Sequence, residues 1–229
     1  MAVFKSQLVT QLSGSIGGLT ASHNKGGMYF RARRTPTNPN SPEQAVVRGL
    51  VAQLTSLWTS VLTLAQRGAW GLYAANVPLI SKVGDAQNVS GLNMYIRTNV
   101  PRIQSGLPRI DLIAAPFDLG DFAVPTVTAT AATDLLNVTF TVADAWVDED
   151  DSSMLVYISR PMSPTIYFFK GPYRFSGRIN GDATTPPTSP ATITLPFAVT
   201  AGQRLAVKIS VSRADGRLST PFRNYVDAA

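Results

Sequence analysis

The chain has 229 residues, of which 20 are Lys or Arg, 14 are Asp or Glu, one is His and none is Cys. With 45% hydrophobic and 15% charged residues, it has the composition of a folded protein of one or two domains. The absence of Cys excludes disulfides, Cys-containing zinc sites and Cys nucleophiles, and a single His excludes sites that need two imidazoles. We therefore expect no cofactor, no bound metal and no enzymatic activity.

Charge is distributed unevenly along the chain. Residues 1–110 contain 11 basic side chains but only two acidic ones, whereas the remaining residues contain nine basic and 12 acidic ones. The basic half is either solvated or faces an acidic partner. No segment has the roughly 20 apolar residues of a membrane span, and the first residues lack the apolar segment of a secretory signal. We expect no membrane association and synthesis in a cytosol.

Residues 1–40 form the first of three compositional zones and are rich in Gly, Ser, Asn and Arg. Residues 16–22 and 28–33 can each be extended, and the segment His23-Asn24-Lys25-Gly26-Gly27 between them is typical of a tight turn. The sequence predicts a β-hairpin followed by an extended segment, which together form an arm that needs a partner to pack on. We interpret His23 as a turn residue and not as a catalytic base.

The predicted arm contains the candidate residues for a partner interface, Tyr29, Arg31, Arg33 and Arg34. Protein interfaces are enriched in Arg and Tyr. In a strand, Tyr29, Arg31 and Arg33 share one face, and Phe30 and Arg34 share the other. Nucleic acid is the alternative partner, because cations neutralise phosphate and aromatic rings stack on bases. We favour the protein interface.

Residues 41–117 form a predicted helical region. Ser41 as N-cap, Pro42 at the first helical position and Gln44 at the third give a helix start with a capping box. The apolar residues from Val46 to Leu62 recur at helical spacing and predict a helix with one wide buried face.

Two further helices follow in this region. A second capping box begins at Thr63 and predicts a shorter helix, and Ser90 is the predicted cap of a third helix that ends near Pro101. The predicted core of the helical region includes Leu50, Leu54, Trp58 and Trp70.

Residues 118–229 form a predicted β-domain. Alternation of apolar and polar residues predicts strands at 136–142, 154–160, 165–170, 172–179, 191–197, 205–212 and 217–225. Short strands with turn signals between them indicate an antiparallel β-sandwich of the immunoglobulin or fibronectin type. The predicted fold class is therefore α+β, with an N-terminal hairpin arm and a small helical region before the sandwich.

Three features of the β-domain are candidate sites. The acidic run Asp148-Glu149-Asp150-Asp151 lacks the alternating spacing of a calcium loop, so we interpret it as a solvated loop. Trp146 is predicted to lie in the core. The aromatic residues of segment 167–175 alternate over both faces of a predicted hairpin. Half of them should be buried, and the others could form an exposed patch or bind a sugar.

Several motifs carry a resemblance to a known family. They are SG-x-I-GG-x-T at 13–20, NKGG-x-Y-x-R at 24–31, P-x-NP-x-SPEQ-x-x-x-R at 36–48, LT-x-AQR-x-AW-x-x-YA at 62–74 and SGLNMYIR-x-N at 90–99. With them, the chain over roughly 13–116 resembles an uncharacterised family found in tailed-bacteriophage and prophage gene sets, whose members are regarded as virion structural proteins. The resemblance carries no activity that could be transferred to this chain.

The resemblance implies a non-enzymatic virion structural protein, assembled in the host cytoplasm, that binds other virion proteins such as the major capsid protein and forms a homo-oligomer. Within the virion we expect a capsid-associated cement or decoration protein. A head–tail connector or tail component is the nearest alternative. A carbohydrate-binding adhesin that uses the sandwich, and a nucleic-acid-binding protein that uses the basic N-terminal half, are alternatives from other classes.

Overall fold

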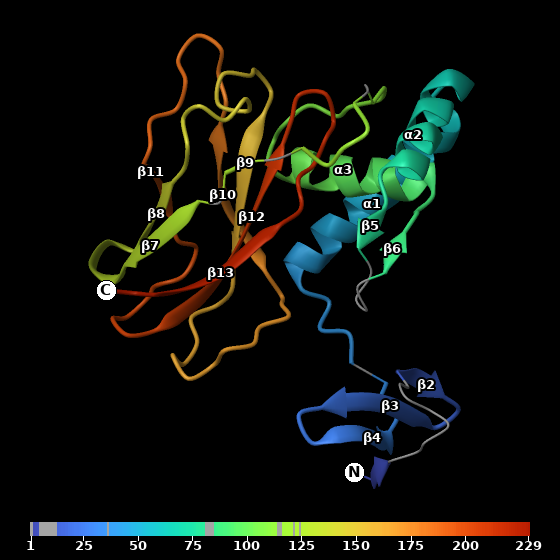
Figure 1. Ribbon diagram of the computed structural model, residues 1–229, viewed down its shortest axis with the longest axis vertical. Coiled ribbons are helices and arrows are strands. Elements are labelled where there is room, and N and C mark those ends of the chain that lie inside the picture. The colour runs from blue at the N-terminus through green and yellow to red at the C-terminus, as the bar shows by residue number, and fades with distance from the viewer. Residues whose placement is uncertain are drawn as a thin grey trace. The chain divides into compact units, whose positions relative to one another are not determined.

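The computed structural model describes residues 2–4, 13–35, 37–80, 85–113, 116–120, 122–123 and 125–229, with residues 2–4 described by their backbone alone. The chain divides into two compact units, Met1–Pro42 and Glu43–Ala229. Within the described residues the fold is α+β, with three α-helices and several antiparallel sheets (Figure 1). The further division at residues 117–118 stays a prediction.

The first unit contains a four-stranded antiparallel sheet. Its strands are β1 (Ala2–Phe4), β2 (Gly14–Ile16), β3 (Leu19–Asn24) and β4 (Gly27–Ala32), in the order β1-β4-β3-β2. The amide of Gly26 donates to Asn24 Oδ1 at 2.9 Å, and Gly27 has a φ of 111°, a value that favours glycine. This two-residue turn is shorter than the predicted one, so His23 lies in β3 opposite Met28 and not in the turn.

The second unit begins with helices α1 (Pro42–Ser60), α2 (Leu64–Asn76) and α3 (Gly91–Gln104). Both predicted caps of the later helices are confirmed. Thr63 Oγ1 accepts from the Gln66 amide at 3.3 Å, and the Gln66 side chain accepts from the Thr63 amide at 2.8 Å. Ser90 Oγ accepts from the Asn93 amide at 3.3 Å. Each cap satisfies an amide that the first helical turn leaves unpaired.

The predicted end of the third helix near Pro101 is wrong, because α3 continues to Gln104. Proline lacks an amide hydrogen and therefore removes one helical hydrogen bond. The last turn is held by other donors. The Ser105 amide donates to the carbonyl of Pro101 at 3.0 Å, and the Leu107 amide donates to the carbonyl of Arg102 at 2.8 Å.

Two larger sheets follow the helices. One has the strand order β10-β9-β12-β13 and the other has the order β11-β8-β7. Their strands are β7 (Thr126–Thr130), β8 (Leu135–Thr139), β9 (Ser153–Ile158), β10 (Arg174–Asn180), β11 (Ala191–Thr194), β12 (Arg204–Ser212) and β13 (Phe222–Asp227). A short helix η1 (Ala131–Thr133) connects β7 to β8, and β5 (Leu79–Ile80) pairs with β6 (Ala86–Gln87) beside the helices.

Two strand predictions need correction. The predicted strand at 165–170 is irregular chain, in which Tyr167 and Phe168 are exposed and the Phe169 amide donates to the Tyr225 hydroxyl at 2.8 Å. Both neighbours of β9 in its sheet are other strands, so this segment connects β9 to β10 without joining the ladder. The last strand begins at Phe222 and not at residue 217, because residues 213–221 form a turn that is anchored by the bridge between Ser212 and Leu218.

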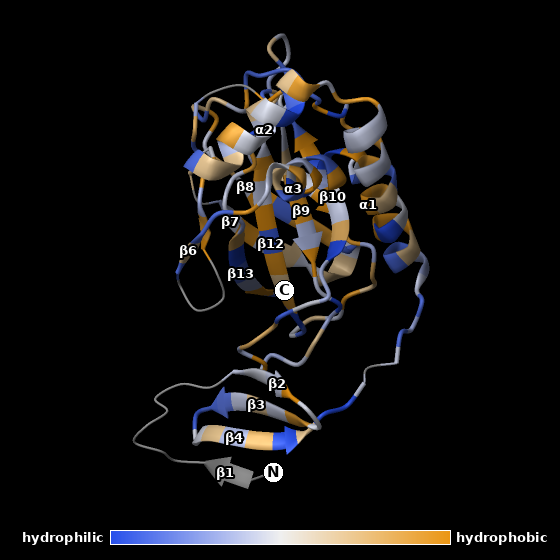
Figure 2. Cartoon of the chain, turned by 90° about the vertical axis from the view of Figure 1, so that its right-hand side faces the viewer, coloured by the Kyte–Doolittle hydropathy of each residue, from blue (hydrophilic) through white to orange (hydrophobic). Residues whose placement is uncertain are grey.

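The two larger sheets share one hydrophobic core. Val156 and Val207 from one sheet and Leu136 and Val138 from the other are completely buried in it, and Trp146 packs there as predicted. Figure 2 shows β12 largely in the hydrophobic colour. All six residues of β9 are buried, because the side of this strand that faces away from the shared core is also covered.

Helices α2 and α3 carry a second hydrophobic cluster around Trp70, Tyr73, Met94 and Tyr95. The ring centroids of Trp70 and Tyr95 are 5.5 Å apart in an edge-on arrangement. Gly91 permits close packing of these two helices, because a Cβ atom at this position would lie 2.8 Å from the Gly71 backbone nitrogen. No described helix combines the length and the hydrophobicity needed to cross a membrane.

Candidate interaction surfaces

The N-terminal sheet has one apolar face. Residues directly opposite each other in an antiparallel pair lie on the same face, and the register pairs Ile16 with Leu19, Leu19 with Ala32, and Ala21 with Phe30. Among the described residues of this unit, Ala21 is the buried apolar side chain, whereas Ile16 is 74% exposed and Leu19 is 53% exposed. This face therefore presents apolar side chains to solvent.

The opposite face of the same sheet is polar and basic. The register pairs Arg31 with Thr20 and Tyr29 with Ser22, which places Tyr29 and Arg31 on one face as predicted. Arg33 and Arg34 follow the end of β4, and all three arginines are exposed. The ion pairs found among the described residues do not involve them. Positive charge is thus concentrated at one end of the sheet.

A second apolar surface lies on α1. The prediction that its wide apolar face is buried is wrong in part, because Val46, Val47 and Val51 on α1 are exposed, as is Val61 directly after the helix. Burial is confined to a narrow line along the helix, since residues four apart in sequence stack on one side. Figure 2 accordingly shows α1 in a mixture of hydrophobic and hydrophilic colours.

The four predicted helical core residues differ in burial. Leu54 and Trp70 are completely buried, whereas Leu50 and Trp58 are half-buried. The ring of Trp58 lies 5.5 Å from that of Tyr95, so it packs on the cluster of α2 and α3. Leu54 and Trp58 thus attach α1 to the other helices.

Arg102 on α3 is a buried cation that the sequence reasoning missed. Its guanidinium donates to the carbonyls of Pro108 at 2.9 Å and Arg213 at 2.8 Å, to Oγ of Ser212 at 2.9 Å, and to the carbonyl of Asp151 at 3.2 Å. Burial lowers its pKa, and nearby acidic side chains act in the opposite direction. Neutral oxygens thus replace water around this charge, and Arg102 joins α3 to two turns of the sheet region.

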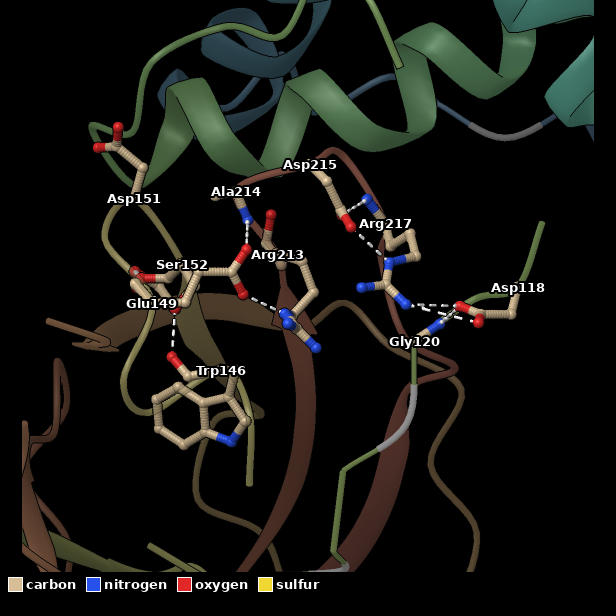
Figure 3. A network of polar contacts seen from close by, with 12 residues as sticks. Asp118, Gly120, Trp146, Glu149, Asp151, Ser152, Arg213, Ala214, Asp215 and Arg217 are labelled. Carbon is tan, nitrogen blue, oxygen red and sulfur yellow. Dashed lines mark hydrogen bonds and ion pairs between the residues drawn. The ribbon is translucent and has the colours of Figure 1, made fainter. Parts of the chain in front are cut away.

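The turn at 213–217 holds two further arginines (Figure 3). Arg213 pairs with Glu149, which also accepts from the Ala214 amide at 3.1 Å. Arg217 binds Asp215 at 2.7 Å and Asp118 at 3.1 Å.

The pKa of Asp118 reflects this contact. Burial acts to raise the pKa of this carboxyl, but the Gly120 amide and the Arg217 guanidinium lower it below its ordinary value. These contacts fix the loops around the helical layer.

The acidic run at 148–151 is only partly a solvated loop. Glu149 is half-buried in its pair with Arg213, and Asp150 accepts from the Ala183 amide at 2.9 Å. In the described part of the chain, no group of three or more His, Asp or Glu side chains is arranged to hold a metal ion. The run therefore serves to connect loops.

Exposed aromatic side chains gather in the connection between β9 and β10. Tyr167 is 76% exposed and Phe168 is 74% exposed. The guanidinium of Arg204 lies 4.8 Å from the Tyr167 ring centroid, and Phe169 packs edge-on against Tyr173 at 5.0 Å. The sequence alternation predicted that some of these aromatic side chains are exposed. It placed them on a strand, whereas Tyr167 and Phe168 lie in irregular chain.

Comparisons with known proteins give little that bears on these surfaces. No protein-family model and no curated protein matches the chain. One partly similar solved structure is a family 76 glycoside hydrolase from a bovine Bacteroides thetaiotaomicron strain, with a TM-score of 0.33, 15% identity, and coverage of 48% of this chain and 20% of that chain. Another is the adhesin domain of Epf from Streptococcus pyogenes, with a TM-score of 0.33, 13% identity, and coverage of 48% and 33%. Each match spans a third or less of the other chain.

Proposed function

We propose that the chain is a non-enzymatic structural subunit of a tailed-bacteriophage particle, and within it a capsid-associated cement or decoration protein. Its partners are then other virion proteins and further copies of itself, assembled in the host cytoplasm. The motifs between residues 13 and 116 support this proposal through their resemblance to a virion protein family. The exposed surfaces described above support it on physical grounds.

The apolar face of the N-terminal sheet is the observation that carries the proposal. Small sheets need a covered hydrophobic face to be stable in water. Ile16 and Leu19 instead lie exposed on the same face of this sheet. Covering them with a partner subunit would contribute roughly 25 cal/mol for each Å² of apolar area buried. A protein that acts alone gains nothing from such a face, whereas a subunit of an assembly uses it to dock.

The edge and the basic face of the same sheet favour a protein partner. Strand β2 lies at one edge and is exposed throughout, so a neighbouring chain can add a strand there. Arg31, Arg33 and Arg34 can pair with carboxylates across the same contact, in the bidentate geometry that guanidinium groups favour. The three features lie within one unit and can engage one partner together.

We further propose that the two larger sheets form an immunoglobulin-like or fibronectin-like sandwich that projects from the particle or bridges its subunits. Immunoglobulin domains of the constant type have seven strands in two antiparallel sheets. Some of the connections between consecutive strands lead from one sheet to the other. Here β7, β8 and β11 make one sheet, whereas β9, β10, β12 and β13 make the other. The pairing of the fourth strand, β10, with β9 supports the fibronectin-like form of this proposal.

The exposed aromatics of the β9–β10 connection keep a carbohydrate-binding adhesin as a second candidate. Tyr167 and Phe168 could stack on sugar rings. Binding to a glycan array that is lost in the double variant Tyr167→Ala and Phe168→Ala would favour this function. The basic face keeps nucleic acid as an alternative partner, and steeply salt-dependent DNA binding by the purified chain would favour it.

Substitutions at Leu19 test the proposed docking face. Leu19→Asp places a charge on the apolar face, and we expect it to abolish incorporation into particles, as should deletion of residues 1–38. Leu19→Val keeps the face apolar and serves as the matched control, which should be incorporated normally. Incorporation is measured by quantifying the chain in purified particles, and a thermal melt checks that the second unit stays folded. Normal incorporation of Leu19→Asp would refute the proposed anchor.

A further inference from the structure

A cavity of about 430 Å³ lies between the helices and the outer face of the β9–β12 sheet, entirely within the second unit. Helix α1 contributes Val47 and Val51, α3 contributes Ile96 and Val100, and the strands contribute Tyr157 and Lys208. The volume falls in the range of about 300–1,000 Å³ that is usual for small-molecule sites. All of its lining residues belong to the second unit, so the inference does not rest on the proposed docking function of the N-terminal sheet.

Two cations line this cavity. Arg97 comes from α3 and Lys208 from β12. Nη1 of Arg97 lies 3.5 Å from the carbonyl of Leu218, and Nζ of Lys208 lies 4.3 Å from the ring centroid of Tyr157. Among the described residues, no carboxylate forms an ion pair with either cation. The cavity thus contains two positive charges without a counter-ion from the described part of the chain.

The surroundings make these charges costly. Burial lowers the pKa of Arg97, and burial together with the neighbouring Arg223 and Arg97 lowers the pKa of Lys208. Lys208 also lies opposite Arg223 in the β12–β13 register, so like charges adjoin it on the same face. An anion bound between Arg97 and Lys208 would relieve both the desolvation and the repulsion.

The walls indicate what else the ligand carries. Most of the remaining lining is apolar and includes Val47, Val51, Ile96, Val100 and Leu218. A small inorganic anion would leave these side chains without a contact, whereas an aliphatic chain would cover them. Val47 and Val51 are 36% and 37% exposed, so the cavity opens to solvent beside α1.

We infer that this cavity binds a small aliphatic carboxylate, with its head group between Arg97 and Lys208 and its chain along α1 and α3. The two cations supply charge-assisted contacts to the carboxylate. The valines and isoleucine supply the apolar contacts that distinguish the ligand from acetate or phosphate.

Titration calorimetry of the full chain with decanoate, below its micellar concentration, tests this inference. Saturable binding of decanoate is expected, with much weaker binding of acetate and of decanol, which lack the chain and the charge respectively. Lys208→Met keeps an apolar stem and should weaken binding roughly tenfold or more, because it removes one charged partner. Absence of decanoate binding, or equal binding of decanol, would overturn the inference.

A pair of variants on α1 tests whether decanoate binds in this cavity, and neither variant alters the buried strands. Val47→Asp replaces an apolar contact of the aliphatic chain with a carboxylate at the mouth of the cavity, and it should weaken decanoate binding because the charge would lose water against the chain. Val46→Asp alters the neighbouring residue, which is 54% exposed and does not line the cavity, and should bind as the wild type does. Equal affinity of Val47→Asp and the wild type would show that decanoate binds elsewhere.

Discussion

The guanidinium of Arg102 on α3 donates through Nη1 to Oγ of Ser212 on β12 at 2.9 Å, and both side chains are completely buried. The two residues are 110 positions apart in the sequence. Together with Thr98, whose hydroxyl donates to the carbonyl of Gly216 at 3.2 Å, this contact fixes α3 over the outer face of the sheet. The helical layer and the sheet therefore form opposite walls of the cavity, which opens to solvent beside α1.

Arg102→Met should destabilise the protein by about 3 kcal/mol or more, because it leaves the buried hydroxyl of Ser212 and three part-buried carbonyls without their charged donor. The free energy of unfolding can be measured by denaturant titration. Arg34→Met, at an exposed position, is the matched control and should change stability by less than about 0.5 kcal/mol. Equal stability of the two variants would show that Arg102 does not hold α3 in place.

Gly91→Ala should destabilise the protein, since the added methyl group would press on the Gly71 backbone where α2 and α3 meet. Gly68→Ala in α2 meets no atom within 4 Å and should stabilise the protein by roughly 0.5–1 kcal/mol through helix propensity. Thermal melts of the two variants should thus move in opposite directions. A higher melting temperature for Gly91→Ala would contradict the close approach of the helices.

Leu54→Ala should cost about 2–5 kcal/mol, because Leu54 is completely buried among the helices. Val46→Ala removes a side chain on α1 that is 54% exposed, and its cost should be less than about 0.5 kcal/mol. Denaturant titration of both variants measures the difference. Similar costs for the two would mean that the solvent-facing side of α1 is covered in solution.

Stability should decrease between about pH 10 and pH 12. Burial raises the pKa of Tyr157 to about 12, whereas the phenol of the unfolded chain ionises near pH 10. As the pH rises, the phenol of Tyr157 therefore loses its proton in the unfolded state before it does so in the folded state. The contribution of this phenol to stability is complete below about pH 10 and is lost as the pH rises to about 12.

By pH 11 the loss from Tyr157 should be about 1.4 kcal/mol relative to pH 9. Burial also raises the pKa of Tyr73 and Tyr95 to about 12, so Tyr157→Phe should remove one of three such contributions. Denaturant titration at pH 9 and pH 11 measures the change. An unaltered pH dependence in Tyr157→Phe would contradict the burial of this phenol.

Local signals predicted local structure well. The Thr63–Gln66 capping box and the Ser90 cap act between residues three apart, so the sequence alone locates both helix starts. Pro101 misled the prediction of the helix end, because the donors that hold the last turn come from residues beyond it.

Contacts between distant segments could not be predicted. The alternation in β12 assigns Lys208 and Ser210 to a polar face, which is the usual pattern of a strand with one side in water. In the structure this face borders a cavity beneath α1 and α3, so Lys208 is largely removed from solvent. Burial of Arg102 has the same origin, since its partners lie 49 to 111 residues away in sequence, apart from nearby Pro108.

The most direct test of the proposed function is mass spectrometry of density-purified particles from the strain that encodes this chain. The proposal predicts that the chain is present in the particles in many copies and is found with the head fraction when heads and tails are separated. Recovery with tails or with the neck would favour the tail or connector role. Absence of the chain from particles that contain the other virion proteins would contradict the proposed function.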